Sequence, residues 1–305
     1  MTKPQLTSET KEAIGKALMA AYKASGFESR AKYARSVDLS SSDFSNIEHE
    51  KWKQNDRLLS VQKWLRLART IGFHFGEEEQ WVTARTATYI TISKQLEACQ
   101  KKSMASIFCD MAGLGKSHVC KEYAATHRNA FYVNGGNYPN RWRFVRALAQ
   151  AIGLDAKGTA EDVLQDVVFY LKSLQNPLLI IDEAGDMDNS TYRLLKRMYN
   201  ELEFHCGFYM VGAPDLRKRI DSSIRLRRNS FEEVYSRFGG RYLDIVPADP
   251  IKQRAFLESE IIQVCTANGV QDPETLNRVV SSALEGKSRG LRYARIQIMK
   301  QRLAA

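Results

Sequence analysis

The stretch Cys109-Asp-Met-Ala-Gly-Leu-Gly-Lys-Ser117 follows the short apolar run Ala105–Cys109 and opens a helical pattern. A phosphate-binding loop needs small residues whose backbone N–H groups turn inward, the N-terminus of a helix, a lysine for the phosphates and a hydroxyl for Mg²⁺. This stretch supplies all four at P-loop spacing, although Asp110 replaces the usual first glycine. The predicted nucleotide contacts are Ala112, Gly113, Leu114, Gly115, Lys116, Ser117 and His118.

A second stretch, Leu178-Leu-Ile-Ile-Asp-Glu-Ala184, is an apolar strand that ends in two acids. At the carboxyl end of a parallel strand, Asp182 is expected to hold Mg²⁺ together with Ser117, and Glu183 to orient and polarise the attacking water. The order of the two stretches therefore predicts an ATP–Mg²⁺ site in which Lys116 and Glu183 carry the catalysis.

Apolar runs alternate with helical patterns throughout the middle of the chain, which predicts a parallel sheet with crossover helices. The predicted strands are Ala105–Cys109, Ala130–Val133, Leu178–Asp182, Phe208–Val211 and Tyr242–Val246. After Pro247 the pattern is helical only, over 250–266, 273–284 and 289–302. The fold class predicted is α/β: a P-loop ATPase core with a C-terminal helical lid.

Later residues favour an ATPase of the AAA+ class over a kinase or a GTPase. Arg237 stands before the last strand, where it would project into a neighbouring subunit's site, with Arg241 as the second choice. Arg292, or alternatively Arg289, begins the last helix, where it would reach back to the γ-phosphate. A surface salt bridge is the ordinary alternative for each arginine. Ala213 stands where the class places a polar first sensor, which predicts slow hydrolysis.

Charge favours a polyanionic partner. The 305 residues contain 45 Lys and Arg against 35 Asp and Glu, for a net charge of +10, and the excess lies in residues 1–75 (+5) and 205–305 (+6) around a neutral middle. Neutralising phosphates with basic side chains adds affinity through counterion release. Solubility is the alternative explanation of the charge.

Several classes of protein are disfavoured by composition. No apolar run approaches the length of a membrane span, and the N-terminus lacks an apolar signal-peptide core. The five cysteines form no C-x-x-C pair, which argues against a disulfide scaffold and a structural zinc site. We expect a cytoplasmic protein of a bacterial host cell, without a membrane partner.

The N-terminal block, residues 1–75, is helical and contains a helix-turn-helix pattern. The first helix is predicted to end at Val37, and Ser41 or Ser42 to cap the second. That second helix would expose its hydroxyls and amides, together with Asp43, to DNA. The acids Asp43, Glu48 and Glu50 would repel phosphates, so a purely structural role stays open. Trp52 and Trp64 are a core pair or, as the alternative, a stacking surface.

The same motifs, in this order behind a helical N-terminal domain, resemble the phage Mu B family of transposition proteins. The resemblance is carried by Cys109–Tyr123, Leu178–Ala184, Val234–Arg237 and Gly290–Arg292. It implies an ATP-dependent, largely non-sequence-specific DNA-binding AAA+ ATPase that assembles into filaments on duplex DNA and delivers target DNA to a transposase. The expected domains are 1–75 (helix-turn-helix), 76–102 (linker and bridging helix), 103–247 (ATPase core) and 248–305 (lid).

In ATPases of this kind, the loop after the second strand contacts the DNA, which here corresponds to Asn134–Arg143. The predicted DNA contacts are Tyr138, Asn140, Arg141 and Arg143. A loop that merely caps the next helix is the alternative. A second candidate is the basic cluster Arg217, Lys218, Arg219, Arg225, Arg227 and Arg228, which also fits a solvated face or an intersubunit contact.

Two other functions stay open at this stage. One is a helicase loader or transposase helper that remodels a protein partner. The other is an ATP-dependent transcription regulator that reads a defined operator through the N-terminal domain.

Overall fold

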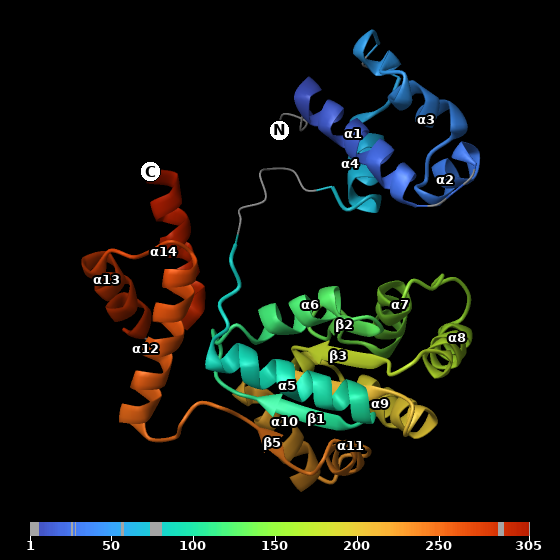
Figure 1. Cartoon of the computed structure of the whole chain (residues 1–305). Helices are drawn as coiled ribbons and strands as arrows, with labels where there is room; N and C mark the ends of the chain where they lie inside the picture. Colours follow the sequence, from blue (N-terminus) through green and yellow to red (C-terminus); the bar gives the residue numbers. More distant parts are fainter. Residues whose placement is uncertain are drawn as a thin grey trace. The chain divides into compact units, whose positions relative to one another are not determined.

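A computed structural model describes residues 6–25, 27, 29–55, 58–73, 81–285 and 290–304. The chain divides into two compact units, Met1–Trp81 and Val82–Ala305, each with its own hydrophobic core (Figure 1). No helix in the described part of the chain has the length and apolarity that crossing a bilayer requires.

The second unit is built on a parallel sheet with strand order β2-β3-β4-β1-β5. The strands are β1 (Ala105–Cys109), β2 (Ala130–Asn134), β3 (Leu178–Asp182), β4 (Gly207–Gly212) and β5 (Tyr242–Leu243). All pairs run parallel, so the predicted α/β fold is confirmed. Because Asn134 pairs with Asp182 and Cys109 with Gly212, the carboxyl ends of β1 to β4 lie along one edge of the sheet.

The last strand is shorter than the sequence predicts. It ends at Leu243 instead of Val246. The backbone N–H groups of Ile245 and Val246 donate to the Asp110 carboxylate, at 2.8 and 3.0 Å, and therefore do not extend the ladder with β1.

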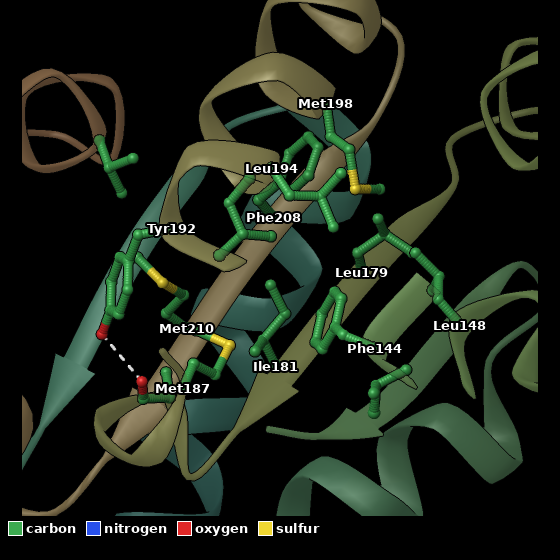
Figure 2. Packing of buried hydrophobic residues seen from close by; sticks show 14 of the residues in the cluster. Phe144, Leu148, Leu179, Ile181, Met187, Tyr192, Leu194, Met198, Phe208 and Met210 are labelled. Carbon is green, nitrogen blue, oxygen red and sulfur yellow. Dashed lines mark hydrogen bonds between the residues drawn. The ribbon is translucent and has the colours of Figure 1, made fainter. Parts of the chain in front are cut away.

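Helices cover both faces of the sheet (Figure 1). One face packs against α5 (Ala87–Lys102) and α6 (Lys116–Thr126). The other packs against α7 (Arg141–Ala151), α8 (Ala160–Ser173), α9 (Asn189–Leu202), α10 (Pro214–Arg225) and α11 (Phe231–Arg237). Figure 2 shows Phe208 and Met210 of β4 packed beneath Leu194 and Met198 of α9, which anchors the centre of the sheet.

Three C-terminal helices form the lid: α12 (Pro250–Ala267), α13 (Pro273–Leu284) and α14 (Gly290–Ala304), so the predicted helices after Pro247 are present. The lid is fastened to the segment that enters the core. The Asn268 side chain accepts from the Val82 N–H at 3.0 Å and donates to the Val82 carbonyl at 2.9 Å. The buried carboxylate of Glu260 accepts from the Thr88 N–H at 3.1 Å.

The first unit contains α1 (Ser8–Ala24), α2 (Arg30–Ser36), α3 (Ser41–Glu48), the 3-10 turn η1 (Lys51–Lys53) and α4 (Val61–Thr70). Trp52 and Trp64 are both buried and meet edge to face, with ring centroids 5.5 Å apart. The core-packing interpretation of this pair is confirmed, and the stacking surface is wrong.

Two details of α3 differ from the sequence prediction. The N-cap is Ser40 instead of Ser41 or Ser42, because the Ser40 hydroxyl accepts from the Asp43 N–H at 3.0 Å. Asp43 is buried instead of exposed, since its carboxylate accepts a hydrogen bond of 2.8 Å from the Lys63 ammonium on α4.

Candidate nucleotide-binding site

The loop between β1 and α6 has the backbone conformation that phosphate binding requires. Gly113 and Gly115 adopt left-handed conformations, with φ of 84° and 81°, which a side chain would strain. Gly115 is also the N-cap of α6, so the loop delivers its last N–H groups at the positive end of that helix. Asp110 is not among the positive-φ residues, so its position does not demand glycine.

Lys116 is held at the start of α6 by the loop itself. Its ammonium donates to the carbonyls of Asp110 and Met111, at 2.7 and 2.6 Å. Burial lowers the pKa of Lys116, while the charges of Asp110 and Asp182 oppose that shift. Ser117 follows Lys116 in the first turn of α6 and is half-buried.

Asp182 and Glu183 occupy the end of β3, with opposite environments. Asp182 is buried, and its two oxygens accept from the Tyr132 hydroxyl at 2.7 Å and from the Glu183 N–H at 2.9 Å. Burial, followed by the bond to Asp182, raises the pKa of Tyr132, so this hydroxyl stays a donor. Glu183 is exposed and has a left-handed backbone, with φ of 49°.

A left-handed glutamate costs about 1–3 kcal/mol and persists only where the surroundings enforce it. The buried Tyr192 of α9 supplies one restraint, since its hydroxyl donates to the Ala184 carbonyl at 2.8 Å (Figure 2). The Glu183 carboxylate itself lies close to Gly136, where an added methyl group would come within 2.6 Å of it. Sequence reasoning missed Tyr132, Gly136 and Tyr192, because their contacts are tertiary.

The lid closes over the loop from α14. The Leu291 N–H donates to the Gly113 carbonyl at 3.0 Å, and its side chain lies 3.5 Å from where a Cβ on Gly115 would stand. Arg292 is exposed on the same first turn, and Arg289 lies outside the described residues.

The side chain of His118, the last of the predicted nucleotide contacts, contacts the segment that enters the core. Its Nε2 and the Thr83 hydroxyl are 2.8 Å apart. Partial burial lowers the pKa of His118 against the opposing charge of Glu122, and the Arg295 guanidinium lowers it further.

Arg237 lies away from the loop at the end of α11. Its guanidinium donates to the Asn200 side chain at 2.9 Å and to the Glu233 carbonyl at 3.2 Å. Such contacts hold an arginine in one direction without neutralising its charge. Arg241 is exposed just before β5.

In the loop after β2 and the first turn of α7, one of the predicted DNA contacts has a structural role and the others are exposed. The Asn140 side chain caps α7 by accepting from the N–H groups of Trp142 and Arg143, each at 3.1 Å, which explains this residue without DNA. Arg141 stacks over the Trp142 ring at 4.2 Å. Tyr138, Trp142 and both arginines are exposed, so the loop presents cations and aromatic faces together.

The basic cluster of α10 separates into two groups. Arg217 pairs with Asp244 at 3.3 Å, Lys218 with Asp215 at 3.1 Å, and Arg219 donates to Asn189 at 3.4 Å. The second group is exposed at the end of α10 and in the turn that follows it, and comprises Arg225, Arg227 and Arg228. Half of the cluster is therefore used within the fold.

On α3 and just after it, the acids expected to repel phosphates are each paired within the N-terminal unit. Asp43 is paired with Lys63 as described above. Glu48 pairs with Arg30 at 3.1 Å, and Glu50 with Lys53 at 2.8 Å. The paired acids present less negative charge than the sequence alone suggests.

Comparison with known proteins agrees with this geometry. Residues 104–220 match the family described as AAA domain. The central domain has the AAA+ fold. The structure of Orc1 from Aeropyrum pernix in complex with DNA is similar to the chain at a TM-score of 0.52 and 17% identity, over 75% of this chain and 63% of that one.

Two further similar structures are Cdc6p from Pyrobaculum aerophilum and the RuvB Holliday junction branch migration motor of Thermotoga maritima. Cdc6p aligns at a TM-score of 0.45 and 14% identity, over 70% of this chain and 66% of that one. RuvB aligns at 0.33 and 14%, over 73% and 71%. Curated protein sequences yield no match. The AAA+ fold of the core rests on the family match over residues 104–220 and on the similarity to Orc1.

Proposed function

We propose that the protein is an ATPase that binds ATP–Mg²⁺ at the AAA+ domain and assembles on duplex DNA. The single observation that carries the proposal is the juxtaposition of a glycine-bearing phosphate loop, a loop-held lysine and the Asp182–Glu183 pair at one edge of the sheet. Lys116 and the loop N–H groups suit the phosphates, and Ser117 with Asp182 offers the oxygen ligands that Mg²⁺ prefers. The residues at this edge of the sheet therefore fit ATP with a bound Mg²⁺.

In this proposal, each residue of the pair has one task. Asp182 offers its carboxylate to the metal and is oriented by the Tyr132 hydroxyl. Glu183 orients and polarises the attacking water from its restrained turn. The metal, when bound, neutralises charge that develops on the phosphates. Arg237 acts in the site of a neighbouring subunit, and Arg292 reaches from the lid, so ATP favours the assembled state.

The loop after β2 is the proposed DNA contact. Arg141 and Arg143 carry exposed charge, and Tyr138 adds an exposed aromatic hydroxyl beside them. The same loop contains Gly136, against which the Glu183 carboxylate lies. A shift of this loop on DNA therefore reaches the catalytic acid directly, which gives a physical basis for DNA-stimulated hydrolysis.

The finer role that we propose is that of the Mu B family: filaments on duplex DNA that deliver target DNA to a transposase and stimulate it. It rests on the order of motifs in the sequence. Electron microscopy of the protein with random-sequence duplex should show filaments or rings with ATP and none with ADP. Disassembled protein in both nucleotides would refute the proposal.

The DNA contact has its own test. Arg141→Ala together with Arg143→Ala should weaken binding to every duplex and reduce the slope of affinity against salt by about 2, one unit per phosphate contact. Arg217→Ala, which removes a charge already paired with Asp244, is the matched control. Unchanged binding by the double variant would move the contact to Arg225, Arg227 and Arg228.

A further inference from the structure

Asp110, the residue that breaks the P-loop pattern, makes three hydrogen bonds that glycine cannot make. Its carboxylate is buried. One oxygen accepts from the Met111 N–H at 2.7 Å. The other accepts from the N–H groups of Ile245 and Val246, at 2.8 and 3.0 Å. Two successive amides on a single carboxylate oxygen form a specific bridge between distant parts of the chain.

The amides held by Asp110 belong to the linker that enters the lid. They lie shortly after β5, and Asp249, the N-cap of α12, stands three residues beyond Val246. The lid returns to the same loop in the first turn of α14, where the Leu291 N–H donates to the Gly113 carbonyl. The phosphate loop is therefore bonded both to the linker before α12 and to the start of α14.

Asp110 is also joined to the nucleotide side of the loop. The Lys116 ammonium donates to the Asp110 backbone carbonyl and to that of Met111. A phosphate that draws Lys116 toward itself therefore pulls on the residue whose side chain holds the linker. The loop and the linker cannot move independently while the carboxylate holds both.

We propose that Asp110 is a positioning residue that transmits nucleotide occupancy of the P-loop to the lid. The coupling rests on the proposed nucleotide binding, whereas the hydrogen bonds of the Asp110 carboxylate are observed directly. In this view the replacement of glycine by aspartate does not weaken the loop. It adds a rigid connection between the phosphates and α12, through which hydrolysis changes the lid that carries Arg292.

Hydrogen exchange of the full chain, with and without ATP–Mg²⁺, tests the proposal. In the wild type, ATP should slow exchange in α6 and also in α12 and α13. In Asp110→Gly, which restores the usual glycine, the amides of Ile245 and Val246 should exchange about tenfold faster without nucleotide, as expected for one lost hydrogen bond. ATP should still slow α6, but its effect on α12 and α13 should disappear.

Two further variants separate coupling from general loss of stability. Asp110→Asn keeps an oxygen for the linker amides but offers no acceptor to Met111, so it should be intermediate; if the glycine variant does not fold, it decides the question alone. Asp272→Ala removes a lid carboxylate that accepts from the Thr275 N–H at 2.8 Å, and it should leave the ATP effect on α12 intact.

Full ATP-dependent slowing of α12 and α13 in the Asp110 variants would overturn the proposal. An equal loss in Asp272→Ala would overturn it as well, because the effect would then reflect lid stability. If ATP does not change hydrogen exchange in α6 of the wild type, the proposed nucleotide binding is contradicted. The exchange rates of the Ile245 and Val246 amides without nucleotide would still test whether the Asp110 carboxylate holds the linker.

Discussion

Replacing Gly136 with alanine should slow ATP hydrolysis while ATP binding stays intact. The new methyl carbon would stand 2.6 Å from one oxygen of the Glu183 carboxylate, 3.1 Å from the Asp186 carboxylate and 3.2 Å from the Asn134 side-chain oxygen. Real contacts of this kind begin at 3.0 Å, so the Glu183 carboxylate must withdraw by about 0.4 Å or more. Gly136 has no left-handed φ, so alanine fits its backbone.

The magnitude follows from the position of the catalytic acid. A misplacement of about 1 Å costs roughly 10²-fold in rate, so a withdrawal of about half that distance should reduce kcat about tenfold. Glu183 is exposed and its carboxylate ends a flexible chain, so the fold should absorb the movement. Lys116 lies on another element and is not among the three nearest neighbours of the new methyl carbon, so the Kd for ATP should change less than threefold, roughly 0.6 kcal/mol.

Steady-state hydrolysis, nucleotide titration and a thermal melt together check this prediction. Asn137→Ala is the matched control, because it places alanine at the next, exposed position of the same loop. Wild-type kcat in Gly136→Ala would refute the proposed role of Glu183. A parallel loss of ATP binding would show that the loop, rather than the acid, had been disturbed.

Three further predictions concern the remaining groups. Arg237→Ala and Lys116→Ala should each be inactive alone but recover hydrolysis when mixed, because the Lys116 variant supplies its arginine to the neighbour's intact site; no recovery would contradict a finger in trans. Tyr132→Phe removes the donor to Asp182 and should raise the Mg²⁺ concentration for half-maximal hydrolysis severalfold, which corresponds to about 1 kcal/mol for one hydrogen bond. An unchanged Mg²⁺ titration would contradict a metal-holding role of Asp182 that Tyr132 supports. Burial lowers the pKa of Lys116, and bound phosphates favour its charged form, so ATP binding at alkaline pH should be accompanied by proton uptake. Calorimetry in buffers of different ionisation enthalpy measures this uptake, and no proton uptake would contradict a contact between the lysine and the phosphates.

The sheet was predictable because each inner strand is a short run of apolar residues between helical patterns, and burial on both faces demands that composition. The strand β5 was predicted too long, because nothing local indicates that the Asp110 carboxylate takes the N–H groups of Ile245 and Val246. The burial of Asp43 could not be predicted for the same reason, because its partner Lys63 lies on another helix.

In the candidate site too, local sequence patterns could be interpreted, whereas tertiary contacts could not be predicted. Residues of the phosphate loop and the Asp182–Glu183 pair are adjacent in sequence, so their chemistry could be inferred directly. The supports of the pair, Tyr132 and Gly136, come from a neighbouring strand and its loop, and only the register of β2 against β3 brings them to it. Asp110 carried a signal in the sequence, its departure from the pattern, but the meaning of that signal required the structure.

The central claim is that ATP is hydrolysed at this site under the control of DNA. The most direct measurement compares steady-state hydrolysis, with and without random-sequence duplex, for the wild type and Glu183→Gln. We predict Mg²⁺-dependent hydrolysis that duplex DNA accelerates in the wild type, and ATP binding without turnover in the variant. Hydrolysis that ignores DNA, or turnover that survives in Glu183→Gln, would contradict the account.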